Sequence, residues 1–144
     1  LKDYEIHAYA ITGSPDGDFE VNGERLVLPP GKIYNLANGA RIALENSLIQ
    51  AFAGGLAGVN FDFQGCSNDY NIEAYRDGTN GDALFTIAYL SLKLKPINQE
   101  ETFNLNVGES KILRDGSKII LRSAIKQEYA GGLNGVVFEL ICRS

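Results

Sequence analysis

The sequence predicts an all-β protein, an antiparallel β-sandwich or jelly-roll-like double sheet with internal duplication. Apolar residues recur at every second position through many short runs, as expected for strands with one buried face. These runs are rich in β-branched and aromatic residues, and Asn-Gly or Asp-Gly pairs stand between several of them. No stretch has a convincing helical period. A closed barrel is the alternative architecture.

The expected strands follow one another with turn-forming residues between them. In chain order they are 4–12, 25–28, 33–36, 40–45, 48–52, 59–64, 70–76, 83–95, 102–107, 111–113, 117–122, 125–129 and 135–142. Three Asn-Gly or Asp-Gly pairs, which begin at Asn22, Asn38 and Asp115, predict tight hairpins. Asn, Asp and Gly favour these turns because they tolerate a positive φ.

One segment of the chain occurs twice. Residues 53–63 return in similar form as residues 130–140, 77 positions later, and the same offset pairs Leu36 with Leu113. The repeated Gly-Gly-Leu-x-Gly motif has two interpretations. Its glycines form either a bulge or corner of the backbone, which the flanking strands favour, or room for a ligand such as a sugar. The organisation that we expect is a single β domain over 1–144, with related halves at about 4–66 and 84–142 and a connector at 67–83.

Composition and charge exclude several classes of partner. A net charge of -5 with scattered Lys and Arg argues against nucleic acid and against an anionic membrane surface. No run of about 18 apolar residues is present, so we expect no membrane span. The chain begins at Leu1 without Met, which suggests a processed N-terminus and an extracellular or cell-surface location. The stretch 107–119 resembles hairpins common in secreted β-domains of prokaryotic surface proteins, which implies the same location.

The two cysteines end the two copies of the repeat at nearly equivalent places. Cys66 and Cys142 are disulfide candidates if the halves pack about a pseudo-twofold axis, and two buried free thiols are the alternative. Together with a single histidine they cannot form a structural zinc site.

The inventory of catalytic groups is thin. The chain has one histidine, no nucleophile elbow, no His-Glu-x-x-His helix and no phosphate loop. We therefore expect that the protein is not an enzyme, and we expect no certain cofactor.

Calcium is the candidate metal, because clustered oxygen ligands on a turning backbone suit a hard cation. Two acidic, glycine-containing stretches have this composition, and the alternative is that both are solvated turns. The candidate ligands are Asp77, Thr79, Asn80 and Asp82 in one stretch and Asp16, Asp18 and Glu20 in the other.

The segment between the halves suggests a ligand surface. Exposed aromatic side chains near amide groups can form a platform for a saccharide, and the alternative is that these tyrosines lie at the edge of the core. The candidate residues are Tyr70, Tyr75, Asn68 and Asn71.

The N-terminal strand suggests a mode of assembly. It precedes a flexible segment, 13–17, and an extended strand on a hinge can add to the sheet of a neighbouring copy. The strand residues concerned are Tyr4, Ile6, Ala8 and Ala10. We therefore expect a structural subunit that assembles with copies of itself into a filament, sheath or surface layer. The alternative is a monomeric secreted binding module for carbohydrate or protein, with calcium as a candidate requirement.

Overall fold

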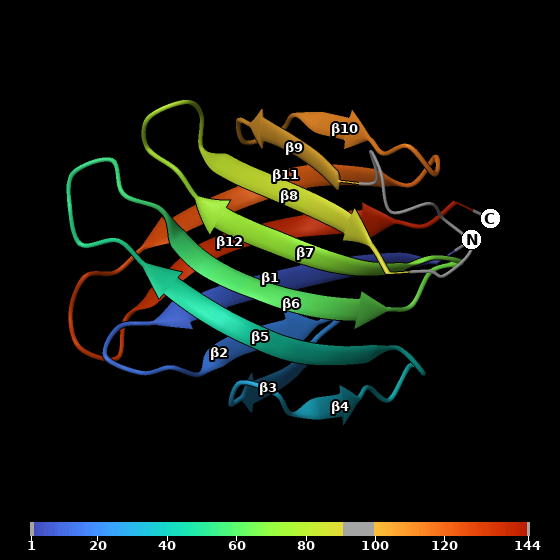
Figure 1. Ribbon diagram of the computed structural model, residues 1–144, viewed down its shortest axis with the longest axis horizontal. Coiled ribbons are helices and arrows are strands. Elements are labelled where there is room, and N and C mark those ends of the chain that lie inside the picture. Colours follow the sequence, from blue (N-terminus) through green and yellow to red (C-terminus); the bar gives the residue numbers. More distant parts are fainter. Residues whose placement is uncertain (1, 91–99, 144) are drawn as a thin grey trace.

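A computed structural model describes residues 2–90 and 100–143, in which two antiparallel six-stranded sheets lie face to face as a β-sandwich (Figure 1). The strands are β1 Asp3–Ile11, β2 Gly17–Val21, β3 Glu24–Leu28, β4 Ile33–Asn35, β5 Arg41–Ile49, β6 Ala57–Gln64, β7 Asp69–Arg76, β8 Ala83–Tyr89, β9 Glu100–Leu105, β10 Ser110–Ile112, β11 Lys118–Lys126 and β12 Leu133–Ile141. The expected all-β sandwich is confirmed. Among the described residues, no helix is long and apolar enough to cross a membrane.

The two sheets have corresponding strand orders. One sheet runs β4-β5-β6-β7-β8-β9 and the other runs β10-β11-β12-β1-β2-β3. When six is added to each strand number of the first sheet, and the count returns to β1 after β12, the strand order of the second sheet results. Each sheet therefore combines three strands from residues 1–66 with three from residues 67–144. A duplication would produce this order, and the duplication itself stays a prediction.

The segment expected as a connector, 67–83, contains β7, where a strand was expected at 70–76. This strand pairs with β6 on one side and β8 on the other, and Tyr70, Ile72 and Ala74 point into the core, where they are fully buried. The strand at the corresponding place is β1, and both begin with Asp-Tyr-x-Ile-x-Ala-Tyr. Residues 3–9 and 69–75 are 66 positions apart, whereas the two glycine motifs are 77 positions apart. An alignment of the two halves at the offset of 77 therefore pairs β7 with no other strand.

Several strand bounds differ from the sequence pattern for an identifiable reason. The two short strands expected within 40–52 form the single strand β5, and those within 117–129 form β11. Each long strand contains a register shift, between Leu44 and Asn46 and between Leu121 and Ser123. Because a bulge moves the alternation by one residue, each long strand looks interrupted in the sequence. Of the strand expected at 83–95, β8 is observed, and residues 91–95 lie outside the described residues.

Hairpin β2–β3 confirms one turn prediction and adds a strand that the sequence pattern did not indicate. Asn22 and Gly23 have φ of 49° and 87°, as a primed two-residue turn requires. Strand β2 precedes this turn and pairs with β1 and β3.

The core lies between the two sheets and consists of the inward side chains of both. Aromatic rings join the layers, with Phe19 against Phe61, Tyr4 against Phe63, and Phe85 against Phe138. Their edge-on packing adds stability to the burial of apolar surface.

The N-terminal strand completes its own sheet. Strand β1 is paired with β12 from Asp3 to Ile11 and with β2 from Ile6 to Ala10. The residues expected to act in strand donation, Tyr4, Ile6, Ala8 and Ala10, point inward and are buried. In this fold β1 is a central strand, and among the described strands those at the edges of the sheets are β3, β4, β9 and β10.

Cys66 and Cys142 form a disulfide, which confirms the first of the two alternatives, a disulfide or two buried free thiols. Their Cα atoms are 5.3 Å apart, and the bond joins the end of β6 in one sheet to the end of β12 in the other. The backbone N–H of Cys142 also donates to the carbonyl of Lys2 at 2.8 Å, so both chain ends lie at this end of the sandwich (Figure 1).

Reduction of the disulfide should lower the free energy of unfolding by about 2–5 kcal/mol, because the bond closes a long loop in the unfolded chain. Urea unfolding with and without reductant measures this difference. The double variant C66S/C142S is the control and should be insensitive to reductant. Equal stability of the wild-type protein in both buffers would contradict the prediction.

The repeated glycines have an architectural role at two corresponding places. Gly54 and Gly131 have φ of 77° and 78°, in the region that favours glycine. At the third glycine of each motif the neighbouring strand is very close. A Cβ at Gly58 would lie 2.0 Å from the carbonyl oxygen of Ala74, and one at Gly135 would lie 2.1 Å from that of Ala8. The motif therefore allows β6 and β12 to pair closely with β7 and β1.

Gly58→Ala should destabilise the protein by about 1–3 kcal/mol or more, because the new methyl group meets backbone rather than a movable side chain. Chemical unfolding measures the loss. Gly78→Ala is the matched control, since a Cβ there has no neighbour within 4 Å and φ is not positive. Equal stability of the two variants would show that the close approach is not a constraint.

Candidate functional site: a cavity at one end of the sandwich

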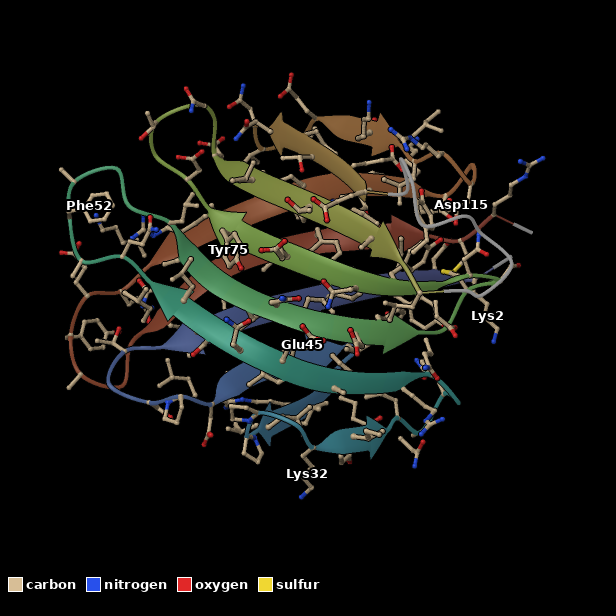
Figure 2. All side chains as sticks on the ribbon, in the orientation of Figure 1. Lys2, Lys32, Glu45, Phe52, Tyr75 and Asp115 are labelled. Atoms are coloured by element: carbon tan, nitrogen blue, oxygen red, sulfur yellow. A yellow bond between two sulfur atoms is a disulfide. The ribbon has the colours of Figure 1, made fainter. Side chains whose placement is uncertain are left out.

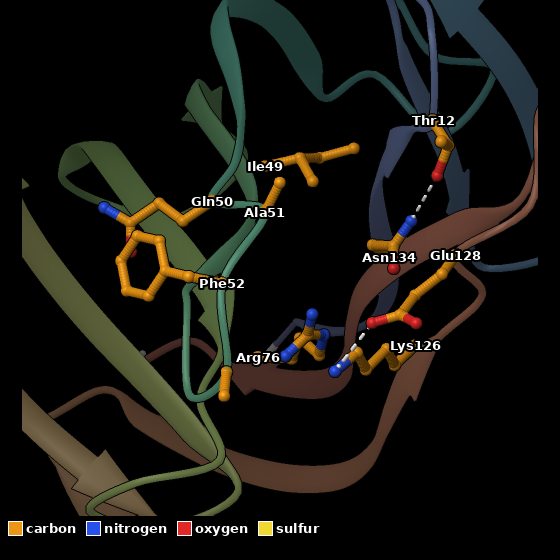
Figure 3. Close-up of a pocket in the computed structure, with 10 residues that line it drawn as sticks. Thr12, Ile49, Gln50, Ala51, Phe52, Arg76, Lys126, Glu128 and Asn134 are labelled. Atoms are coloured by element: carbon orange, nitrogen blue, oxygen red, sulfur yellow. Dashed lines mark hydrogen bonds and ion pairs between the residues drawn. The ribbon is translucent and has the colours of Figure 1, made fainter.

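A cavity of about 480 Å³ lies at the end of the sandwich opposite the disulfide (Figures 2 and 3). Two loops frame it, 50–56 between β5 and β6 and 127–132 between β11 and β12. These are the loops that carry the repeated glycine motif. The lining residues are Thr12, Ile49, Gln50, Ala51, Phe52, Ala53, Arg76, Lys126, Glu128 and Asn134.

Two rows of paired inward residues, one in each sheet, lie at this end of the sandwich, and four of these six residues line the cavity: Ile49, Arg76, Lys126 and Asn134. In one sheet Ile49, Ala57 and Arg76 are paired across β5, β6 and β7. In the facing sheet the corresponding row is Lys126, Asn134 and Ala10 across β11, β12 and β1. The first half of the chain contributes the apolar members Ala10, Ile49 and Ala57, and the second half contributes the polar members Arg76, Lys126 and Asn134. Within these two rows, the second half therefore supplies the polar side chains.

Arg76 is the unusual member of these rows. It lies two residues beyond Ala74 on the inward face of β7 and is only 9% exposed. Its Nη1 donates to the carbonyl oxygen of Gly55 at 3.1 Å, whereas its Nε has no hydrogen-bond partner. Among the described residues, no carboxylate forms an ion pair with it. A buried guanidinium without an anion is costly by several kcal/mol, and the corresponding residue of β1 is alanine.

A second cation and one carboxylate lie beside Arg76 (Figure 3). Lys126 Nζ is 2.8 Å from Glu128 Oε1, so the lysine holds this carboxylate. Hydrogen bonding and attraction to Lys126, with a smaller contribution from the charge of Arg76, keep the pKa of Glu128 below its ordinary value. Glu128 is therefore ionised at neutral pH, and the three side chains together carry one net positive charge.

Two further polar residues of the cavity, Thr12 and Asn134, are bonded to each other and to Gln127. Asn134 Nδ2 donates to Thr12 Oγ1 at 2.9 Å, and Thr12 Oγ1 donates to the carbonyl oxygen of Gln127 at 3.1 Å. Asn134 Oδ1 accepts from the backbone N–H of Gln127 at 3.1 Å. These bonds fix the loop 127–132 rather than leave groups for a ligand.

The opposite wall is apolar. Loop 50–56 places Ala51, Phe52 and Ala53 along the cavity, and Phe52 is 65% exposed. Gln50 holds this loop, since its Oε1 accepts from the backbone N–H of Leu56 at 2.9 Å. The cavity thus has a cationic corner and an apolar wall, an arrangement that can bind an anionic group attached to an apolar body.

The residues expected to bind calcium are held in separate interactions. Asp77 accepts from Thr79 N at 2.9 Å and from Asn104 Nδ2 at 3.1 Å, and Asp82 accepts from Val107 N at 2.9 Å. These bonds hold the loop between β7 and β8 against Asn104 and Val107, and Asp77 is buried rather than solvated. Asn80 lies in the same loop.

In the second acidic stretch two of the three carboxylates have partners. Asp18 pairs with Arg25 at 2.7 Å and Glu20 lies 3.7 Å from His7. Both lie on strand β2 rather than in a turn, and Asp16 precedes it. In the parts of the chain that the structure describes, no three His, Cys, Asp or Glu side chains are grouped to hold a metal ion. Calcium binding stays a prediction without a site in this geometry.

The four residues expected to form an aromatic platform do not share one surface. Tyr70 is fully buried in the core, whereas Tyr75 and Asn71 belong to the alternate positions of β7, where they bond to Glu73 and Asp62. Tyr70 and Tyr75 therefore cannot stack on one ligand, because residues an odd number apart in a strand face opposite sides.

Tyr70 and Asn68 instead belong to a hydrogen-bond network that joins the two sheets. Tyr70 Oη donates to an oxygen of Asp115 and lies 2.9 Å from Ser117 Oγ, and Asn68 Nδ2 donates to the same carboxylate at 3.0 Å. Asp115 lies at the end of the sandwich away from Phe52 (Figure 2). Burial acts to raise the pKa of Asp115, but the hydrogen bonds from Tyr70, Asn68 and Ser117 together hold it below the usual 3.8.

The cavity residues were absent from the sequence-based site predictions, although the sequence contains a signal for one of them. The motif Asp-Tyr-x-Ile-x-Ala-Tyr ends at Tyr9 and at Tyr75, and the next residue is Ala10 in one copy and Arg76 in the other. A charged side chain at an inward position, where the related strand has alanine, indicates a candidate functional residue. Nothing in the sequence placed Lys126, Glu128 or Phe52 beside it.

Comparison of the chain with protein-family models, with curated protein sequences and with solved structures finds no match.

Acidification should destabilise the protein partly through Asp115. Because its pKa is lower in the folded state, it contributes stability above the usual carboxyl pKa, and this is lost as the pH falls through the folded value. We expect a smaller loss of unfolding free energy between about pH 6 and about pH 3 in Asp115→Asn than in the wild type. Urea unfolding at both pH values tests this. Asp3→Asn, at an exposed position, is the control and should behave as wild type.

Proposed function

We propose that the protein is a secreted binding module that takes an anionic group of its ligand into the cavity at Arg76. The observation that carries this proposal is a nine-tenths buried guanidinium whose Nε has no partner and which lines an open cavity. Buried polar groups are normally satisfied, so such a group favours a binding partner from outside the chain.

The surroundings of Arg76 support binding rather than catalysis. Thr12, the one hydroxyl group of the lining, is engaged with Asn134 and Gln127. Glu128 is held by Lys126 and is not hydrogen-bonded to a nucleophile. The Cys66–Cys142 disulfide is typical of proteins of oxidising compartments, which supports the extracellular location.

Arg76→Gln should fold and should weaken binding of small carboxylates by at least tenfold, a loss of about 1.4 kcal/mol or more. NMR shift titration with acetate measures the affinity. Arg41→Gln removes the same charge at an exposed position at the far end of β5 and is the control. The melting temperature of Arg76→Gln should equal or exceed that of wild type, since an unpaired buried charge is removed.

Equal acetate affinity in Arg76→Gln and Arg41→Gln would overturn the proposal. The stability measurement separates this outcome from misfolding, because a misfolded Arg76→Gln protein would lose its cooperative melting transition.

Self-assembly is the second candidate, and edge strands rather than β1 now favour it. Strand β4 exposes Ile33 by 57% and strand β10 exposes Ile112 by 66%, and both have an open edge. Open edges with apolar side chains pair readily with another chain. Along each long side of the sandwich, edge strands of both sheets lie together, β3 with β4 and β9 with β10 (Figure 1).

If copies associate through these edges, light scattering should show oligomers that Ile33→Lys or Ile112→Lys reduces, because a charge blocks edge pairing. Electron microscopy of the same samples would show whether the oligomers are filaments or sheets. A monomer of 15.7 kDa at high concentration would contradict this candidate and would leave the binding proposal untouched.

A further inference from the structure

We infer that the ligand of the Arg76 cavity is a monocarboxylic acid with an apolar body, an inference that rests on the proposed binding function. The acid group would lie at Arg76 and the apolar body along the wall formed by Ile49, Ala51, Phe52 and Ala53. Charge, hydrogen-bond geometry, the character of the walls and the volume of the cavity each support this class.

The charge of the cavity matches one negative charge. Arg76 and Lys126 are cations and Glu128 is an anion, which leaves a net charge of +1 among the lining residues. A monoanion neutralises this charge. A second negative charge on the ligand would be repelled by Glu128, so a phosphate dianion fits less well.

The guanidinium keeps one donor group for a carboxylate. Nη1 is used by the carbonyl oxygen of Gly55, and Nε is buried without a partner and has almost no exposed surface. No hydrogen bond of Nη2 is found among the described residues. Because a guanidinium NH2 group forms a charge-assisted hydrogen bond with a carboxylate oxygen, Arg76 can bind a carboxylate through Nη2 while it keeps its bond to the loop.

The remaining lining argues for an apolar body rather than a polyol. A sugar needs many hydrogen-bonding partners, but Thr12 and Asn134 are bonded to each other and to Gln127. The side chains of Ile49 and Phe52, which are 38% and 65% exposed, offer apolar surface for the body of a ligand. Burial of this surface would contribute about 25 cal/mol per Å².

The volume of about 480 Å³ is larger than a carboxyl group requires. It lies within the roughly 300–1,000 Å³ of small-molecule sites. An acid with an aromatic or branched aliphatic group is therefore of suitable size, and two sources share this chemistry. One is a free small acid, and the other is the C-terminus of a peptide that ends in an apolar residue.

Isothermal titration with 3-phenylpropanoate, its primary amide, acetate and inorganic phosphate tests the inference. We expect 3-phenylpropanoate to bind at least tenfold more tightly than acetate or phosphate, and the amide to show no binding. Phe52→Ala should reduce the advantage over acetate to less than about threefold through lost apolar contact. Tyr129→Ala is the matched control, because Tyr129 occupies the corresponding place on the other loop, is 64% exposed and does not line the cavity.

The outcomes separate this inference from the proposed function. Equal affinity for acetate and 3-phenylpropanoate, or tightest binding of phosphate, would overturn the apolar monocarboxylate while an anion site at Arg76 remains. Failure of every anion to bind would overturn both. Loss of the advantage in Tyr129→Ala but not in Phe52→Ala would also contradict the inference, since the apolar body would then lie elsewhere.

A further arm distinguishes the two sources. A tripeptide that ends in phenylalanine is titrated as the free acid and as the C-terminal amide. Tighter binding of the free-acid peptide than of 3-phenylpropanoate assigns the site to a chain end, and weaker binding assigns it to a free acid. Both results support the shared chemistry, whereas equal binding of the peptide acid and its amide would contradict it.

Discussion

The alternation of side chains along each strand is the constraint on which the rest of this structure depends. Because two sheets face each other, every second residue enters the shared interior, where Phe19, Phe61 and Phe138 are fully buried. The same period places Arg76 inside, two residues after Ala74 on β7. At the end of the sandwich this position opens to a cavity instead of the apolar core, so a guanidinium can lie there.

The two halves of the strand order are built alike but differ in chemistry at that end. Both glycine loops have the same positive φ and the same close approach to the neighbouring strand. Beneath them, however, the rows of inward residues are apolar where the first half contributes and polar where the second half does. The backbone constraint therefore explains the repeated motif, and the departure from repetition, above all Arg76 against Ala10, marks the candidate site.

Much of the fold could be predicted from the sequence, because alternation and turn chemistry are local signals. The strands, the turn at Asn22-Gly23 and the disulfide as one of two alternatives were within reach. Strand β2 was missed because Asp16 and Asp18 resemble turn residues. The cavity was out of reach, because Arg76 and Lys126 come from different sheets. They meet only when the sheets pack. The alternation of apolar and polar residues along a strand does not indicate which inward residues of the two sheets then face each other.

The proposed function depends on one contact, which the guanidinium of Arg76 makes with a carboxylate of the ligand. Arginine Nε–H NMR spectra recorded during titration with 3-phenylpropanoate test it most directly. We expect the Arg76 signal, assigned by its absence from Arg76→Gln, to shift with saturation while the signals of exposed Arg41 and Arg122 stay in place. An unchanged Arg76 signal, with shifts spread evenly over the surface arginines, would contradict binding at Arg76.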